Sequence, residues 1–487
     1  MMNTHLLLLR RRCSRYSRRA AAALFFGLAL TLTFAASPAA HADAVDDVVN
    51  AEMKRRDIPA VSLVIYKGDR LVKKAAYGVA DLELGTPTKP EHRFETGSIG
   101  KTLTATLAML LVEEGKWALD DPVKKHFPDA PATWDKITLR HLLSHTSGLP
   151  DYALVPGLGL VERWTPDDWT KKIVTLPLDF ETGTAFAYSN TNYYLLGLLL
   201  ARVAGKPYEA LLAERVLKPA GMNDTIPMSN REIIPGRAKG YWRLQDGQLV
   251  NAPEMVEGGA DGGLVGTADD LAAFERSFRT GKLVKPAAAK EMQASQRLPD
   301  KRGSGYGYGW FVRDLYGHPW LSHGGNTAGF AASVSRFPDQ DLTVAVVCNQ
   351  ASIQGDDLAR RVAEAVAPAL APPKWEEKPD PDPKRTETLK AALLALATGR
   401  PADAADGLDP AFRSRLATPR GQMGLGGFAP LRDLKDLAFL EERVPDPVAG
   451  DRLVRYRARV GEAKRPFNVA FTVTPEGRVF SVGIRPE

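Results

Sequence analysis

The chain has 487 residues, which is long enough to bury a large core and predicts two or three domains. Its formal net charge is +6, but six arginines and no acidic residue lie within residues 1–42, so the rest of the chain has no formal net charge. The basic balance therefore gives no support for a nucleic-acid partner. Of the two cysteines, Cys13 lies in that basic segment and Cys348 ends an apolar run. We expect this basic segment to be removed, which leaves Cys348 as the only cysteine. We therefore expect no internal disulfide and predict a buried core thiol at Cys348.

Residues 1–42 have the three regions of an export signal. The arginine-rich start is followed by an apolar region over residues 20–37, and residues 40–42 (Ala-His-Ala) form a small-x-small cleavage site. The apolar region is short and interrupted by polar residues, so we expect no retained membrane span. We predict an exported protein, periplasmic or extracellular. The pair Arg18-Arg19 leaves open whether export is of the Sec or the twin-arginine type.

A helix and a hairpin are predicted next. Apolar residues at helical spacing predict a helix over residues 43–56, with Asp43 as its N-cap. Strand-like runs at residues 61–66 and 71–77 flank residues 67–69, which have the composition of a hairpin turn.

Ser98 and Lys101 lie three residues apart, so on a helix both side chains emerge on one face, about 60° apart. A serine hydroxyl becomes a good nucleophile when a neighbour accepts its proton, and a desolvated neutral lysine can do so. The apolar run over residues 102–114 predicts a buried helix that ends at Gly115. Ser98 would then lie at the N-terminal end of this helix, where backbone N–H groups stabilise an oxyanion.

Two further motifs follow in the chain. Tyr188 and Asn190 precede an apolar run over residues 193–203, so a phenol and an amide can face one cleft at the start of a helix. Residues 323–325 (His-Gly-Gly) lie between a strand end and a strand start, where the glycines would let a substrate lie close to the sheet edge.

Residues 43–371 are called the main region from here on, and its last segments complete its predicted architecture. Residues 328–337 and 342–349 form a second predicted antiparallel pair, followed by a closing helix over residues 356–370. Strands at both ends of the region therefore predict a single antiparallel sheet. Residues 98–280 are expected to form a helical lobe beside it.

A separate small α+β domain is predicted over residues 385–487, after a proline-rich and charged linker at residues 372–384. A helix is expected over residues 386–398, and three alternating runs predict strands at residues 454–460, 467–473 and 480–484. Arg455, Arg457 and Arg459 alternate with apolar residues in the first of these strands. We predict a solvated face there, and binding of an anionic polymer is the alternative.

The three motifs, in this order, resemble those of the penicillin-recognising serine hydrolases, and most of all the class C β-lactamase and esterase branch. Residues 94–97, 137–149 and 262–267 match the same pattern around the motifs. The resemblance covers about residues 43–370 and implies an α+β fold of the β-lactamase/transpeptidase type. In this fold an antiparallel sheet is flanked by terminal helices and accompanied by a helical lobe, here over residues 43–371.

The resemblance implies a role for each motif residue. Ser98 is the acylated nucleophile and Lys101 is its proton acceptor. Tyr188 relays protons to the leaving group and helps to activate the deacylating water, and Asn190 holds an amide or carbonyl group of the substrate. A neighbouring ammonium favours the phenolate, which agrees with this division of roles.

The third motif departs from the β-lactamase pattern. His323, Gly324 and Gly325 stand where penicillin-binding relatives carry lysine, then serine or threonine, then glycine. We expect these three residues to bind substrate, and the N–H groups of Ser98 and Asn326 to form the oxyanion hole. Histidine is mostly neutral at pH 7 and resembles the esterase and D-aminopeptidase members. It favours an ester or amide without a carboxylate near the scissile bond.

The predicted substrate is a small molecule: a carboxylic ester, a D-amino-acid peptide of the cell wall or a β-lactam, in that order, with cell-wall material as a further partner. No run of residues has metal-ligand spacing, so neither a metal nor another cofactor is expected. An α/β-hydrolase is excluded because Thr96 occupies the first glycine position of Gly-x-Ser-x-Gly. The remaining alternative is a non-catalytic cell-wall or ligand-binding protein that keeps the penicillin-recognising fold.

Several aromatic and histidine side chains are interpreted as packing residues. His141 and His145 flank two leucines and are predicted to pack rather than to catalyse. Tyr306, Tyr308 and Trp310 alternate at strand spacing and could either wall the pocket or belong to the core.

Overall fold

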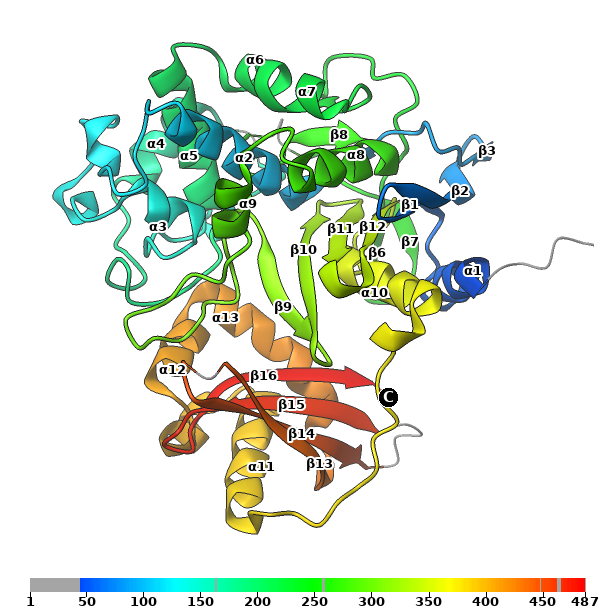
Figure 1. The fold of residues 1–487 in the computed structure, drawn as a ribbon, viewed down its shortest axis with the longest axis vertical. Coiled ribbons are helices and arrows are strands. Elements are labelled where there is room, and N and C mark those ends of the chain that lie inside the picture. Colours follow the sequence, from blue (N-terminus) through cyan, green and yellow to red (C-terminus); the bar gives the residue numbers. More distant parts are fainter. Residues whose placement is uncertain (1–43, 163, 256–258, 447, 462–465, 487) are drawn as a thin grey trace, which may run out of the picture. The chain divides into compact units, whose positions relative to one another are not determined.

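The structure, a computed structural model, is drawn in Figure 1 and describes residues 44–162, 164–255, 259–446, 448–461 and 466–486. The predicted export signal over residues 1–42 and the predicted N-cap Asp43 lie outside the described residues. Among the described residues, no helix is both long enough and apolar enough to cross a membrane.

A seven-stranded antiparallel sheet unites the two ends of the main region. Its order is β3-β2-β1-β12-β11-β10-β9, and β1 pairs with both β2 and β12. Both predicted strand pairs and the single sheet are therefore confirmed. The strands are β1 (Ala60–Lys67), β2 (Arg70–Asp81), β3 (Thr86–Pro87), β9 (Phe311–Leu315), β10 (His318–Asn326), β11 (Ala331–Phe337) and β12 (Leu342–Cys348).

Both faces of this sheet are covered by helices. Leu63 and Val346 pack on one side with α1 (Ala44–Arg56) and α10 (Gly355–Val366), which lie together in Figure 1. Val64 and Ala345 face the opposite side, where α8 (Ala268–Arg279) packs. Burial of both faces explains why the central strands are apolar at nearly every position. The Cys348 thiol is free and buried in this core, as predicted.

The helical lobe lies between the two halves of the sheet in sequence, as predicted. Its helix α2 (Gly100–Glu113) is followed by Gly115, whose left-handed φ of 70° confirms the predicted stop. The other helices are α3 (Leu139–Leu143), α4 (Pro166–Ile173), α5 (Asn190–Ala204), α6 (Tyr208–Leu212), α7 (Lys218–Ala220) and α9 (Pro286–Met292).

The lobe also holds short strands that no sequence pattern predicted, because two or three residues are too few to show a period. These strands are β4 (Phe94–Glu95), β5 (Ile226–Pro227), β6 (Tyr241–Arg243), β7 (Leu249–Asn251) and β8 (Leu264–Gly266). The strand β8 pairs with β4 directly before the Ser98 turn and so fixes the start of that turn.

Two predictions need correction. The closing helix ends at Val366 and not at residue 370, because the chain turns into a short 3-10 helix at Pro368–Leu370. The aromatic residues at positions 306, 308 and 310 are buried but do not lie in a strand, since β9 begins only at Phe311. Positive φ angles at Gly305 and Gly309 interrupt the extended backbone there.

Residues 385–487, named the C-terminal module from here on, contain a four-stranded antiparallel sheet of order β13-β14-β15-β16. The first strand, β13, was not predicted, since its charged sequence does not alternate. The elements here are α11 (Pro383–Ala397), α12 (Pro410–Ala417), α13 (Pro419–Gly424), β13 (Leu434–Asp446), β14 (Asp451–Val460), β15 (Phe467–Val473) and β16 (Val479–Pro486). That this module is a separate domain stays a prediction.

The predicted solvated arginine face is wrong at Arg455. This side chain is buried, donates to Glu441 at 2.9 Å and to Asn468 at 2.7 Å, and lies over the Trp375 ring. Arg457 donates to Glu377 at 3.0 Å. The segment before α11 therefore covers this face of β14, and carboxylates from the chain itself neutralise the row.

Candidate active site

A cavity of about 420 Å³ contains Ser98 and brings most of the predicted site residues together. Ser98 lies in a 3-10 turn, Gly97–Ile99, directly before α2 (Gly100–Glu113), as the Ser-x-x-Lys spacing predicted. The predicted residues that line the cavity are Ser98, Tyr188, Asn190, His323, Gly324 and Asn326. Lys101 lies beneath Ser98 and is fully buried.

The amine of Lys101 has three oxygen partners. Its Nζ lies 3.0 Å from Ser98 Oγ, 2.8 Å from Asn190 Oδ1 and 2.6 Å from the backbone oxygen of Asp261. The two carbonyl oxygens can only accept hydrogen bonds, whereas the serine hydroxyl can donate or accept.

This asymmetry fits a proton acceptor. A neutral amine has two N–H donors and one lone pair, and the two carbonyl oxygens use both donors. The lone pair then faces the hydroxyl of Ser98, ready to accept its proton. After transfer, the ammonium has three donors for the same three oxygens. The site therefore accommodates both states without a buried donor left unpaired.

Glycines allow the end of β10 to lie against the Ser98 turn. A Cβ atom at Gly325 would lie 1.9 Å from the carbonyl oxygen of Thr96, and one at Gly97 would lie 2.9 Å from the Asn326 nitrogen. No other residue fits either position without moving the backbone. The backbone nitrogen of Asn326 is thereby brought next to the turn that carries Ser98, where the oxyanion hole is expected.

Tyr188 lies in the same cavity, with its ring centroid 5.0 Å from Lys101 Nζ. Its hydroxyl forms no hydrogen bond with the described residues, so the ring is held by packing. It stacks on Phe311 with centroids 6.0 Å apart and lies 4.4 Å from the His145 ring. His145 Nδ1 accepts from the Ser189 N–H at 3.2 Å, and burial lowers its pKa well below the ordinary value. His145 is therefore a neutral packing residue beneath Tyr188.

Comparison with known proteins agrees with this geometry. Residues 45–368 match the Beta-lactamase family. The chain belongs to this family. Esterase EstB of Burkholderia gladioli is 31% identical over 319 residues, which cover 57% of this chain and 80% of that protein. Penicillin-binding protein 4* of Bacillus subtilis is 24% identical over 363 residues, covering 68% of this chain and 77% of that protein.

Solved structures give the same fold. The D-stereospecific amidohydrolase from Streptomyces sp. has a TM-score of 0.58 at 26% identity and covers 67% of this chain and 99% of its own. The octameric penicillin-binding protein homologue from Pyrococcus abyssi has a TM-score of 0.59 at 24% identity and covers 91% of this chain and 98% of its own. These matches confirm the predicted family, the predicted β-lactamase/transpeptidase-like α+β fold and the prediction of a serine hydrolase.

In this member of the Beta-lactamase family, both ring nitrogens of His323 are occupied. Nδ1 lies 2.7 Å from the carbonyl oxygen of Gly324, which can only accept, so Nδ1 carries the proton. Nε2 then accepts from the hydroxyl of Tyr306 at 3.0 Å. Burial lowers the pKa of His323 to about 3, so the ring is neutral at pH 7. His323 lines the cavity without a free N–H or a charge.

Three polar residues near the site had not been predicted: Asp151, Asp261 and Arg420. Tyr306, which was expected either to wall the pocket or to belong to the core, is buried and bonds to His323. Asp261 directly precedes residues 262–267, which match the family pattern, so its place in the sequence was a signal that could have identified it. Its backbone oxygen accepts from Lys101, and its carboxylate accepts from Tyr152 at 2.8 Å. Burial raises the pKa of Asp261. Asp151 and Arg420 belong to no motif. Arg420 lines the cavity, and Asp151 lies behind the lining, bonded to Arg420 and to the backbone of Asn190.

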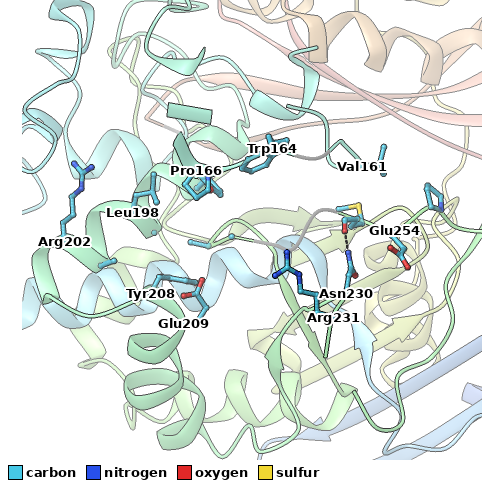
Figure 2. A pocket seen from close by; sticks show the side chains of 17 residues that line it. Val161, Trp164, Pro166, Leu198, Arg202, Tyr208, Glu209, Asn230, Arg231 and Glu254 are labelled. Carbon is cyan, nitrogen blue, oxygen red and sulfur yellow. Dashed lines mark hydrogen bonds between the residues drawn. The ribbon is translucent and has the colours of Figure 1, made fainter. Parts of the chain in front are cut away.

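A second, larger cavity of about 980 Å³ adjoins the first. Figure 2 shows Trp164 and Arg231 on opposite sides of it. Trp164, Met255 and Gly259 line both cavities, so the space around Ser98 continues into the larger one. A substituent that is too large for the first cavity has room there.

Proposed function

We propose that this protein is an exported serine hydrolase that cleaves an ester or amide bond through a covalent acyl-enzyme on Ser98. The observation that carries this proposal is the position of Lys101 Nζ, 3.0 Å from Ser98 Oγ and held by two carbonyl oxygens. Export rests on the pattern of residues 1–42 and implies a periplasmic or extracellular location.

The proposed reaction has two stages. Lys101 accepts the proton of Ser98 while Oγ attacks the substrate carbonyl, and the N–H groups of Ser98 and Asn326 stabilise the oxyanion. Tyr188 passes a proton to the leaving group, which departs and leaves the acyl group on Ser98. A water molecule then attacks the acyl carbon, with Tyr188 helping to remove its proton. The bond between the acyl carbon and Ser98 Oγ breaks, and Lys101 returns its proton to Oγ, which regenerates Ser98.

The neutral His323 supports an ester or an amide of a D-amino acid over efficient turnover of β-lactams. A substrate carboxylate beside residue 323 would meet a ring with no charge and no free donor. The names of two relatives, Esterase EstB and the D-stereospecific amidohydrolase, agree with this preference. Carboxylic esters are therefore the first candidates, D-amino-acid peptides the second and β-lactams the third.

A fluorophosphonate probe tests the hydrolase against a non-catalytic protein with the same fold. The purified chain should be labelled, and the Ser98→Ala variant should not, because the probe reacts only with an activated serine. A folded wild-type chain that is not labelled would favour the non-catalytic alternative. Labelling of the variant would place the nucleophile elsewhere. A panel of short-chain nitrophenyl esters, D-alanyl amides and nitrocefin then ranks the substrates.

A further inference from the structure

The C-terminal module contributes a residue to the active-site cavity. Arg420, in α13, lines the same cavity as Ser98 and Tyr188. Its side chain is 45% exposed, so the guanidinium lies at the boundary between the cavity and solvent. All the motif residues precede residue 330, so no motif suggested a contribution from this module.

Arg420 is linked to the nucleophile by a chain of polar contacts. Its Nη2 donates to Oδ2 of Asp151, a side chain only 4% exposed. Oδ1 of Asp151 accepts from the backbone N–H of Asn190 at 3.1 Å, at the first residue of α5. The Asn190 Oδ1 atom accepts from Lys101 at 2.8 Å. Arg420 thus neutralises the buried carboxylate that fixes the position of Asn190.

The same guanidinium also lies over the ring of Tyr188. Its central carbon is 5.2 Å from the ring centroid, and Lys101 Nζ is 5.0 Å from that centroid. A guanidinium is attracted to the face of an aromatic ring, so the contact with Arg420 helps to fix the position of the Tyr188 ring.

Other ion pairs hold the module against the hydrolase region without touching the cavity. Arg302 donates to Asp451 at 3.0 Å, and Arg297 donates to Asp446 at 3.2 Å. Arg443 pairs with Asp314 at 3.1 Å. The position of α13 is therefore maintained independently of Arg420, which can be substituted without removing the module.

We propose that Arg420 is a positioning residue through which the C-terminal module completes the active site. It orients Asp151 and Asn190 and packs over the ring of Tyr188. The inference rests on the proposed function, because it assigns to Arg420 an effect on the step in which Tyr188 moves a proton. The module is then a part of the catalytic unit and not only an appendage.

Three variants of the full chain test this assignment: Arg420→Ala, Arg420→Lys and Arg420→Gln. With the best nitrophenyl ester, we expect Arg420→Ala to lower kcat about tenfold or more while KM changes less than about threefold, since a positioning residue acts on the chemical step. Arg420→Lys keeps the charge and should recover more activity than Arg420→Gln.

Arg413→Ala is the matched control, because it removes an exposed arginine from the same module, in α12, and should leave kcat and KM unchanged. If Arg420→Ala does not fold, the lysine and glutamine variants test the assignment, and the lysine variant should be the more active. Equal activities of those two variants, or an Arg420→Ala enzyme with a kcat within twofold of wild type, would overturn the assignment. Fluorophosphonate labelling of wild-type Ser98 separates this result from failure of the proposed function itself.

Discussion

The two walls of the active-site cavity each carry a buried nitrogen base, and they use it in opposite ways. On the helical wall, Lys101 is fully buried and has three oxygen partners. On the strand wall, His323 is equally buried, but it donates to one carbonyl and accepts from one phenol. Burial lowers the pKa of His323, whose two ring nitrogens already have partners, whereas three oxygens surround the Lys101 amine and can accept from all three N–H groups of an ammonium.

We therefore assign Lys101 to the proposed catalysis and His323 to the recognition of substrate. The lysine can accept and return a proton during each turnover, whereas the histidine stays neutral and holds the wall in place. In the proposed mechanism the cavity has a proton acceptor next to Ser98, whereas the side chain at position 323 carries no charge. Each prediction below changes one wall and leaves the other intact.

The largest effect is expected on the helical wall. Lys101→Met should lower kcat/KM by at least about 10³-fold, because no other group can take the proton of Ser98. Lys101→Arg should lose as much, since a guanidinium does not release its proton near neutral pH. Steady-state kinetics on a nitrophenyl ester measures both effects, with a thermal melt to verify folding. More than a tenth of wild-type activity in the arginine variant would remove Lys101 from its role as the base.

The strand wall is expected to make the protein sensitive to acid. The pKa of His323 is lowered from 6.5 to about 3, so the unfolded chain binds a proton in this pH range that the folded site does not. The free energy of unfolding should fall as the pH drops below about 6.5, by up to about 1.4 kcal/mol per unit for this residue. The lowered pKa of His145 acts in the same direction.

Urea unfolding between pH 7 and pH 4 measures this effect. A His323→Gln variant should lose stability less steeply than wild type over that range, because it lacks one of the two buried histidines. If the free energy of unfolding falls equally steeply with decreasing pH in both proteins, His323 does not resist protonation in the folded state.

The smallest effect is a change of selectivity. His323→Lys restores the cation that penicillin-binding relatives carry and should raise the ratio of nitrocefin to nitrophenyl ester turnover about tenfold, since a charge-assisted hydrogen bond contributes about 1.5–3 kcal/mol. Tyr306→Phe removes the hydrogen bond to His323 without adding charge and serves as the control, with an unchanged ratio. If the lysine variant leaves the ratio unchanged as well, the identity of residue 323 does not set the substrate preference.

The sequence predicted the parts of this site that are local in the chain. Ser98 and Lys101 lie in one helical turn, so their contact follows from spacing alone. The position of Tyr188 and Asn190 before one helix indicated that both could face a cleft. Their roles and that of His323 were assigned only through the family resemblance, because α5 and β10 lie far apart in the chain. The apolar runs of β1 and β12 likewise predicted the central strands.

The rest depends on tertiary contacts that leave no period in the sequence. The contact between Asp151 and Arg420 spans 269 residues, and neither residue stands in a motif. The hydrogen bond between Tyr306 and His323 explains why that histidine is neutral, but alternation at residues 306–310 indicated a strand that does not form. The strand β13 was missed because its charged residues pair with arginines of β14 and not with solvent.

The central claim is that Ser98 carries the acyl group during turnover. The most direct test is to quench the enzyme during turnover of a slowly deacylated ester, digest it and locate the added mass by tandem mass spectrometry. The account predicts one acyl group, on the hydroxyl oxygen of Ser98. An acyl group on a different side chain, or steady hydrolysis with no acylated peptide at any time point, would contradict it.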